Sequence, residues 1–359
     1  MSATEGPRSS RSPAIQWYPG HIAKAEKALH EALAKVDLVI EVRDARIPLS
    51  TGHPRLQRWI SGKQHLLVLN RLDMVPTAVR EDWSRWFRSR EQQVWWCDAK
   101  AGTGVKQLQQ AAIRSGEALN ARRTGRGMKP RPVRALMLGF PNVGKSALIN
   151  RLVRQKVVDS ARRAGVTRSL RWVRLGQALD LLDAPGVLPP RLDDQRAALR
   201  LALCDDIGQA AYDSEAVAVA FVQLLAQLAA VPGTGVEPDL LPQRYGISLG
   251  TLGDGGPDAE TWLLDAAARH TSGDTTRMAT KLLDDYRCAR LGPIALELPE
   301  SLDTAGGPLN PVLPRSGALV DSADPIDVVV PLACLEADDP PPVDHGHDHG
   351  QLEEGMPQP

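Results

Sequence analysis

The sequence predicts an α/β protein with a doubly wound, mainly parallel sheet, followed by a small all-helical domain and a disordered acidic tail. Three observations support this prediction. Short apolar runs alternate with helix-compatible segments up to residue 182, as in a doubly wound sheet. After residue 190 only helical patterns follow. Residues 301–359 hold ten prolines and eleven acidic residues with few aromatic ones, a composition typical of disorder.

Strands are expected where buried apolar runs are bounded by turn signals, and helices where helix formers predominate. The expected strands cover residues 36–42, 66–69, 94–96, 135–138, 172–175 and 179–182, the last two as a pair. The expected helices cover residues 21–36, 147–152, 193–203, 214–230, 259–270 and 276–289, and a basic linker covers residues 122–134. The predicted domains are a disordered start (1–14), the sheet domain (15–190), the helical domain (191–300) and the tail (301–359).

Charge is distributed unevenly along the chain. Residues 301–359 hold eleven of the 43 acidic residues and one of the 43 basic ones, so residues 1–300 carry 32 acidic and 42 basic residues, a net charge of +10. A basic body suggests a polyanionic partner, with nucleic acid first. A mildly basic enzyme with a solvated tail has the same composition.

Two function classes are disfavoured by composition. The four cysteines, at positions 97, 204, 288 and 334, have no metal-binding spacing, which argues against a zinc site and fits a reducing compartment. The longest apolar stretch, residues 216–231, is too short for a bilayer span and predicts a buried helix. We therefore expect no membrane span and a cytoplasmic protein, with an organelle as the alternative location.

Residues 139–146 match the phosphate-binding P-loop pattern GxxxxGK[ST]. The run lies between an expected strand and an expected helix, which is the context that such a loop requires. Its backbone N–H groups would bind phosphates, Lys145 would neutralise the β/γ oxygens, and Ser146 would bind Mg²⁺. In the Asp-Ala-Pro-Gly run that closes the strand pair, Asp183 is expected to hold Mg²⁺ and the Gly186 N–H to approach the γ-phosphate.

The tetrad Asn70-Arg71-Leu72-Asp73 follows an expected strand, at the edge where such sheets bind ligands. The Asp73 carboxylate can accept hydrogen bonds from the ring N–H and the exocyclic amine of guanine, and adenine offers neither there. Arg71 stands where the usual residue is Lys, which keeps the charge but changes the shape.

A second base-contacting loop, normally Ser-Ala-Lys, is expected at Asp98-Ala99-Lys100 after the next strand. The alternative is that the two are unrelated polar loops. The expected nucleotide-binding residues are Asn70, Arg71, Asp73, Asp98, Ala99, Lys100, Gly139, Pro141, Asn142, Val143, Gly144, Lys145, Ser146, Ala147 and Gly186.

The order of these motifs is reversed. In an ordinary GTPase the P-loop comes first, whereas here both base-reading loops precede it. The sequence therefore predicts a circularly permuted P-loop GTPase domain that binds GTP or GDP with Mg²⁺. Thr167, between the P-loop and Asp183, is the candidate switch threonine for Mg²⁺. It lies in the run 151–174, whose eight basic residues and single acid fit a solvated face or an RNA-phosphate contact.

The chain resembles the ribosome biogenesis GTPase A family of circularly permuted GTPases. The resemblance covers residues 15–300 and depends on the opening peptide at residues 15–25, which contains Tyr-Pro-Gly-His, on Asp-Ala-Arg-Ile-Pro at 44–48, on Gly-Val-Thr-Arg at 165–168 and on Arg-Tyr-Gly at 244–246. It implies a GTPase that binds the precursor of the large ribosomal subunit, contacts rRNA and ribosomal proteins, hydrolyses GTP and leaves. We expect it to be a monomer.

Val187 follows the Asp-Ala-Pro-Gly run, where many GTPases place a glutamine that orients the attacking water. Because valine cannot do this, hydrolysis is expected to be slow alone and faster on the ribosome. The resemblance assigns the missing group to His21, for which a packing role is the alternative. It also implies a K⁺ ion held near the phosphates by Asn142.

Two alternatives stay open. The chain could be an RNA-binding or ribosome-binding scaffold that uses GTP as a structural ligand with little hydrolysis, which Val187 permits. The acidic tail could fold over the basic face and compete with RNA, although flexible sequence without a partner also fits its composition.

Overall fold

The structure is a computed structural model that describes residues 15, 29–153, 171–184, 186, 194–251 and 257–299. The chain divides into two compact units, Met1–Arg315 and Ser316–Pro359, and every described residue belongs to the first. The start of the chain and the acidic tail, for which the sequence predicts disorder, lie outside the described residues. The predicted domain boundaries stay a prediction.

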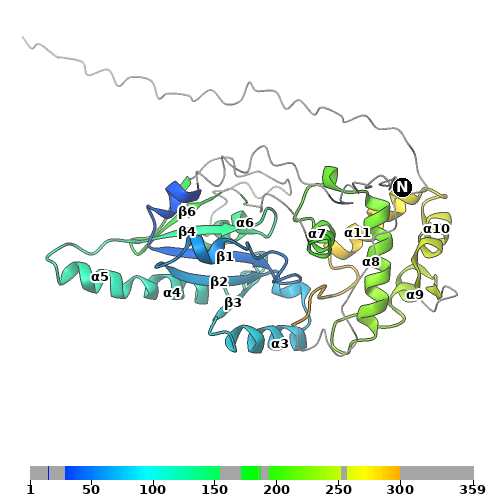
Figure 1. The fold of residues 1–359 in the computed structure, drawn as a ribbon, viewed down its shortest axis with the longest axis horizontal. Coiled ribbons are helices and arrows are strands. Elements are labelled where there is room, and N and C mark those ends of the chain that lie inside the picture. Colours follow the sequence, from blue (N-terminus) through cyan, green and yellow to red (C-terminus); the bar gives the residue numbers. More distant parts are fainter. Residues whose placement is uncertain are drawn as a thin grey trace, which may run out of the picture. The chain divides into compact units, whose positions relative to one another are not determined.

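A six-stranded sheet with the order β3-β2-β1-β4-β6-β5 forms the first half of this unit (Figure 1). Neighbouring strands are parallel except β5 and β6, which form the expected antiparallel pair. The strands are β1 (Leu38–Asp44), β2 (Gln64–Asn70), β3 (Val94–Cys97), β4 (Val133–Gly139), β5 (Arg171–Leu175) and β6 (Leu179–Asp183).

This strand order confirms the circular permutation. The strand that leads into the P-loop, β4, lies at the centre of the sheet, with β1 on one side and β6 on the other. The strands that carry the base-reading loops, β2 and β3, extend the sheet beyond β1 although they precede β4 in the chain. Ligands of open α/β sheets bind at the carboxyl ends of the strands where the strand order reverses, and here that point lies between β1 and β4.

Alternation along the central strands buries both faces of the sheet. On β1, Leu38 and Ile40 join one apolar cluster and Val39 joins the other. The cluster that contains Val39 also takes in residues 29 and 33, which are helical, and α2 (Leu56–Trp59). The other cluster takes in α3 (Thr77–Arg88), α4 (Val105–Ser115) and α6 (Lys145–Val153). The sheet is therefore doubly wound, as expected.

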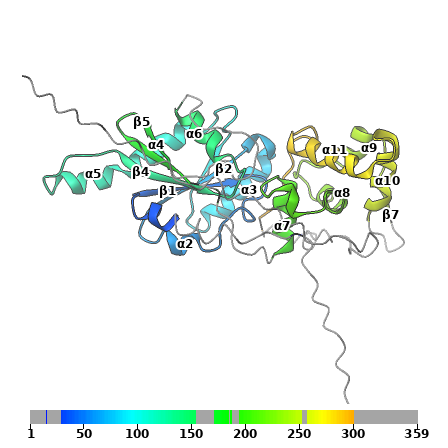
Figure 2. The ribbon, with the colours of Figure 1, turned by 90° about the horizontal axis from the view of Figure 1, so that it is seen from above.

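The elements that follow β6 in the described part are helices and one short hairpin, grouped beside the sheet in Figure 2. They are α7 (Gln195–Leu203), η3 (Gln209–Ala211), α8 (Ser214–Ala229), α9 (Leu240–Tyr245), β7 (Gly250–Thr251), β8 (Pro257–Asp258), α10 (Ala259–His270) and α11 (Thr275–Arg287). Within the described residues, no helix has the length and apolar character needed to cross a membrane.

Aspartate side chains fix where four of these helices begin. Asp194, Asp213, Asp258 and Asp274 each precede a helix and accept a hydrogen bond from a backbone N–H of its first turn. Such caps satisfy donors that the helix itself leaves unpaired. The predicted starts of these helices are therefore correct within two residues.

Three short pieces of structure differ from the expectation. The helix α9 and the β7–β8 hairpin were not predicted, because six and two residues are too few to show a period. The linker expected at residues 122–134 begins inside a helix, α5 (Glu117–Thr124). This helix buries none of its residues, so apolar periodicity gives no signal for it.

Candidate nucleotide-binding site

The P-loop begins at the carboxyl end of β4 and has a backbone that two positions reserve for glycine. Gly139 has φ 158° and Gly144 has φ 96°. A Cβ atom on Gly139 would lie 2.2 Å from the Val42 carbonyl oxygen, and one on Gly144 would lie 2.2 Å from Asn70 Nδ2. Both glycines therefore let the loop pack directly against the neighbouring strands β1 and β2.

Lys145 is buried inside this loop. Its Nζ donates hydrogen bonds to the carbonyl oxygens of Phe140, at 2.7 Å, and Gly139, at 3.2 Å. Burial lowers the pKa of Lys145 to about 8, although the charge of Asp183 acts in the opposite direction. The ammonium group is thus held by loop carbonyls, in a position from which it can exchange them for phosphate oxygens.

Asn70 connects three motifs that lie far apart in the sequence. Its Nδ2 donates to the carbonyl oxygen of Val143 at 2.8 Å, and its Oδ1 accepts from the Ala99 N–H at 3.1 Å. The side chain is 2% exposed. One amide therefore holds the P-loop, the tetrad and the second base loop in a single site.

Arg71 has a structural role that explains why arginine can stand in the tetrad. Its Nη2 donates to the carbonyl oxygen of Asn142 at 2.7 Å, and its Nε lies 3.2 Å from Asp44 Oδ2. The backbone of Arg71 is left-handed, with φ 67°. The forked guanidinium thus links the P-loop to the end of β1 with two different nitrogens, which a lysine could not do.

Asp73 and Asp98 lie close enough for their charges to interact. Burial raises the pKa of Asp73, and the Asp98 carboxylate adds to this effect. The Asp98 side chain accepts hydrogen bonds from the backbone N–H groups of Lys100, at 2.7 Å, and Ala101, at 3.0 Å. A serine oxygen can accept such bonds as well, so the change from the usual Ser keeps the loop's turn. The Lys100 side chain is exposed.

The described magnesium candidates lie at the end of the P-loop and at the end of the neighbouring strand β6. Asp183 ends β6, is 1% exposed and pairs in register with Met137 of β4. Ser146 lies in the first turn of α6, followed by Ala147. A Cβ atom on Gly186 would lie 2.7 Å from the backbone nitrogen of Pro141, so only glycine lets this segment approach the P-loop so closely. A serine hydroxyl and a buried carboxylate are oxygen ligands that suit Mg²⁺.

Three predicted residues, His21, Thr167 and Val187, lie outside the described residues. Asn142 is described and has a left-handed backbone, with φ 55°. Its Nδ2 donates to the carbonyl oxygen of Asp205 at 2.6 Å, which leaves its Oδ1 for a cation. The side-chain chemistry of Asn142 therefore fits the K⁺ ligand expected there.

A buried polar network at the end of β1 was not predicted from the sequence. Asp44 accepts two side-chain hydrogen bonds from Arg46, at 2.9 and 2.7 Å, and both side chains are fully buried. Arg46 Nη2 also donates to the carbonyl oxygen of Cys204 at 3.0 Å, and its guanidinium lies 5.3 Å from the centre of the Tyr286 ring. The Asp-Ala-Arg segment thereby ties the end of β1 to α7 and α11.

Asp206 belongs to the same network but has no hydrogen-bond partner among the described residues at either carboxylate oxygen. Burial and the nearby charge of Asp44 raise its pKa well above the ordinary value, which favours a neutral carboxyl group. A ligand oxygen of Asp206, one of Asp44 and the Cys204 sulfur lie within 4.8 Å of one another. Arg46 and Arg71 already occupy the oxygens of Asp44, and their charges disfavour a cation beside them.

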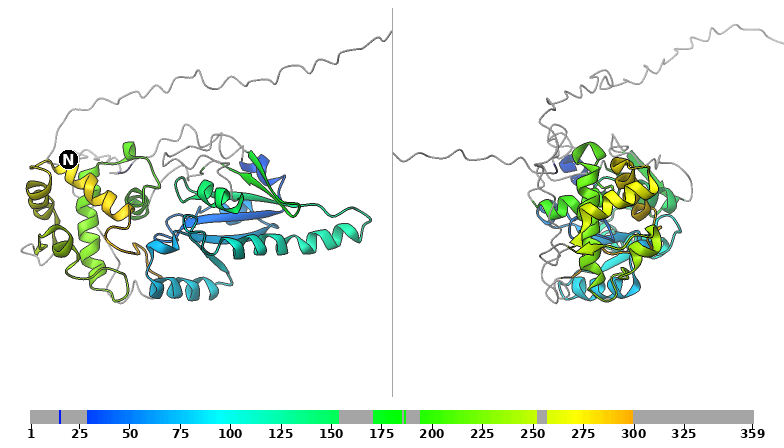
Figure 3. Two further views of the ribbon diagram at one scale, coloured as in Figure 1. Left: turned by 180° about the vertical axis from the view of Figure 1, so that it is seen from behind. Right: turned by 90° about the vertical axis from the view of Figure 1, so that its right-hand side faces the viewer.

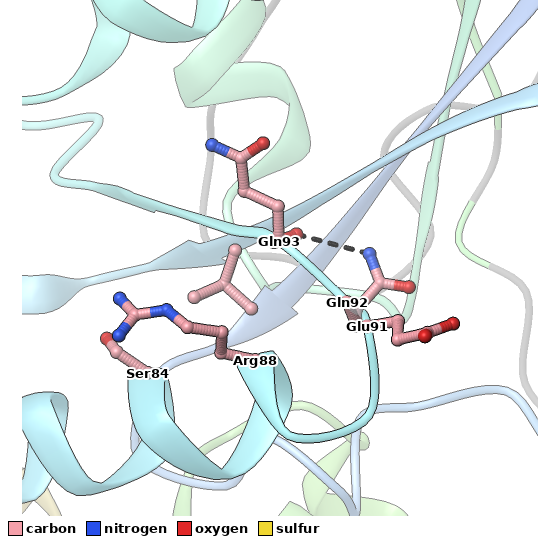
Figure 4. A pocket seen from close by; sticks show the side chains of 6 residues that line it. Ser84, Arg88, Glu91, Gln92 and Gln93 are labelled. Carbon is pink, nitrogen blue, oxygen red and sulfur yellow. Dashed lines mark hydrogen bonds between the residues drawn. The ribbon is translucent and has the colours of Figure 1, made fainter.

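A pocket of about 420 Å³ lies elsewhere, between the end of α3 and the start of β3 (Figure 4). Its lining includes Ser84, Arg88 and Gln92. The pocket is at the amino end of β3, whereas the motifs described above meet at the carboxyl ends of the strands. It is therefore not part of the candidate nucleotide site.

Comparisons with known proteins agree with this geometry. A family model described as "50S ribosome-binding GTPase" matches residues 134–224. The Bacillus cereus protein "Ribosome biogenesis GTPase A" is 32% identical over 293 residues, which cover 80% of this chain and 94% of that protein. The mouse "Mitochondrial ribosome-associated GTPase 1" is 34% identical over 201 residues, 54% of this chain and 61% of the relative.

Solved structures share the fold. GDP-bound YlqF of T. maritima has a TM-score of 0.50 and 20% identity, and the match covers 76% of this chain and 99% of that one. The matched structure spans both the sheet and the helices that follow it.

Proposed function

Because the chain belongs to the ribosome biogenesis GTPase A family and is a GTPase, we propose that it is an assembly factor for the large ribosomal subunit. It binds the subunit precursor in the GTP state and leaves after hydrolysis. The observation that carries the nucleotide part is the pair of hydrogen bonds made by Asn70, which hold the P-loop and both base-reading loops together. The names of the relatives support the ribosomal part.

Each nucleotide-site residue then has a role. Asp73 pairs with guanine, the P-loop N–H groups and Lys145 bind the phosphates, and Ser146, Thr167 and Asp183 hold Mg²⁺, which neutralises charge that develops on the phosphates. Asn142 offers its Oδ1 to K⁺. His21 positions the attacking water, a role that rests on the resemblance of the opening peptide.

The partners that we propose are rRNA and ribosomal proteins of the large-subunit precursor, with residues 191–300 as an RNA-binding domain and a monomeric protein as the active form. We propose the cytoplasm as its location, since the Bacillus relatives are bacterial proteins. An organelle is the alternative, because the mouse relative is named as mitochondrial.

The test is GTP hydrolysis in K⁺ buffer, alone and with purified large subunits, for the wild type and His21→Ala. We expect subunits to raise the turnover of the wild type at least tenfold, and His21→Ala to abolish the stimulation while GTP affinity stays within twofold. Stimulation that survives His21→Ala would return that histidine to a packing role. Tight GTP binding with no stimulation would favour the scaffold alternative.

A further inference from the structure

The segment between α4 and β4 carries a strong positive charge that the fold does not use. We call residues 117–134 the basic arm; it consists of α5, the eight residues that join α5 to β4, and the first two residues of β4. The basic arm has six basic residues and one acidic residue, Glu117. Figure 3 shows α5 reaching beyond the sheet, and none of its residues is buried. Its side chains therefore add nothing to the apolar core.

Most of these charges have no counter-charge close by in the described part of the chain. Arg131 forms a bidentate ion pair with Asp37 at 2.7 and 2.8 Å, and the charge of Arg134 also acts on that carboxylate without forming an ion pair. The others form no ion pair with a described carboxylate, and all but Arg123 are exposed. They are Arg122, Arg123, Arg126, Lys129 and Arg134.

The folding of the arm gives no reason for this composition. A helix that is polar all round is ordinarily stabilised by pairs of opposite charge three or four residues apart, and α5 has none. Its arginines instead donate to backbone carbonyls: Arg122 Nε to Ala118, at 3.3 Å, and Arg123 to Lys129, at 3.2 Å. Like charges held this close repel one another and favour a polyanionic ligand.

An exposed aromatic ring extends this surface onto the sheet. Trp172 of β5, an edge strand, is 44% exposed. The guanidinium of Arg134, at the start of β4, lies 5.8 Å from the centre of its ring. Arg174 is exposed on the same strand, although its Nε also lies 3.4 Å from Asp180 Oδ1. Cations beside an exposed indole are the elements with which proteins bind phosphates and stack an unpaired base.

We propose that the basic arm and the exposed face around Trp172 bind RNA, with the arm on the phosphate backbone and Trp172 stacking on an unpaired base. This inference rests on the proposed ribosomal function, and it adds an RNA contact on the GTPase domain to the one proposed for the helical domain. The arm enters β4 at its amino end, whereas the P-loop leaves the carboxyl end seven residues later. The two ends are roughly 20 Å apart, so the arm should bind RNA equally in the GTP and GDP states.

The test compares two triple variants of the full chain, each of which loses three exposed positive charges. The arm variant is Arg122→Ala/Arg126→Ala/Lys129→Ala, and the control variant is Arg58→Ala/Arg85→Ala/Arg88→Ala, from α2 and α3. RNA affinity is measured with large-subunit rRNA and with a single-stranded oligonucleotide, over a range of salt concentrations and with GDP or a GTP analogue. Thermal unfolding and GDP affinity check that each variant is folded.

We expect the arm variant to bind RNA roughly tenfold more weakly at low salt and the control variant to stay within about twofold. The slope of log affinity against log salt should fall by about 2 in the arm variant, since each lost phosphate contact removes about 0.7. Trp172→Leu should weaken binding to the single strand and not to a duplex of the same sequence.

Four outcomes would overturn the inference. Equal losses in both triple variants would show a non-specific effect of net charge, and no loss in the arm variant would remove the site. In both cases the proposed function stands if large subunits still stimulate hydrolysis. An arm variant that binds RNA normally but no longer binds a peptide of residues 301–359 would assign the arm to the acidic tail. A wild type that binds neither RNA nor subunits would contradict both proposals.

Discussion

At the residue scale, Asp73 is the proposed source of guanine selection. A carboxylate accepts hydrogen bonds from both N–H groups on that edge of guanine, whereas an asparagine amide offers one acceptor and one donor. Asp73→Asn should therefore weaken GTP binding roughly 100-fold, since one mispaired group that the bound base buries costs about 1–3 kcal/mol. The variant should favour XTP, because the exocyclic oxygen of xanthine accepts a hydrogen bond from the asparagine amide. Competition binding with GTP, XTP and ATP measures this. Asp82→Asn on α3 is the control, and an Asp73→Asn protein that still prefers GTP would contradict the assignment.

Lys145 should make nucleotide affinity depend on pH. In the free protein its pKa is lowered to about 8, mainly by burial. Bound phosphates favour the charged form, so they raise this pKa, and binding above pH 8 must take up a proton. Affinity for GDP should be constant below about pH 7.5 and fall by up to tenfold per pH unit above 8. Calorimetry in buffers of different ionisation enthalpy measures both effects. Lys145→Met should bind weakly with no step near pH 8; a step that persists would assign the titration elsewhere.

Single residues of the site were predictable where a motif names them, as for Asn70, Lys145 and Asp183. The reason why Arg71 and Asp98 replace the usual residues appears only in the structure, in the bonds to Asn142 and to the turn at Lys100. Asp206 carries no motif, because its environment is assembled from segments more than 130 residues apart in the sequence.

At the element scale, one carboxylate joins α9 to α11. The side chain of Asp285 is fully buried and accepts hydrogen bonds from Arg244, at 2.9 Å, Tyr245, at 3.0 Å, and Arg290, at 2.9 Å. Burial raises the pKa of Asp285, but these donors outweigh it and hold the pKa below its ordinary value. The Arg-Tyr-Gly segment of the family resemblance is thus a structural clamp.

Asp285→Ala should destabilise the protein by about 1–3 kcal/mol, because it leaves the buried Tyr245 hydroxyl without its acceptor, whereas the guanidinium of Arg244 is partly exposed and can be solvated by water. The contribution of Asp285 is complete above its unfolded pKa, near 3.8, and is lost as pH falls through the lower folded pKa. Urea unfolding at pH 7 measures the difference. Asp284→Ala, one residue away and exposed, is the control and should cost less than about 1 kcal/mol. Similar losses in the two variants would show that Asp285 is no clamp.

Elements with a clear period were predictable, and the strands came within two or three residues of the observed ends. Those missed lack that signal: α5 buries nothing, and α9 and the β7–β8 hairpin are too short to show a period. Their positions depend on tertiary contacts such as the bonds of Arg244 to Asp285.

At the scale of the whole molecule, motif order alone predicted the permutation, because the base-reading loops precede the P-loop in the sequence instead of following it. The attachment of the helices to the sheet was not predictable. It depends on two residues. Arg46 donates to the carbonyl oxygen of Cys204. The side chain of Glu297 accepts from the N–H of Leu49 at 2.6 Å, and its backbone carbonyl oxygen accepts from the Trp83 indole N–H at 3.2 Å. Such contacts join residues more than 150 positions apart.

The split of the sheet into two consecutive halves has a consequence for synthesis of the chain. The half β3-β2-β1 is complete once Cys97 has emerged, and its three strands can pair before β4 exists. Until β4 arrives, β1 is an unpaired apolar edge, the kind of surface on which nascent chains aggregate. The segment that emerges next lies between β3 and β4. Its most highly charged stretch is residues 122–134. We expect that charge to keep the half-built sheet apart from its copies until β4 closes the edge.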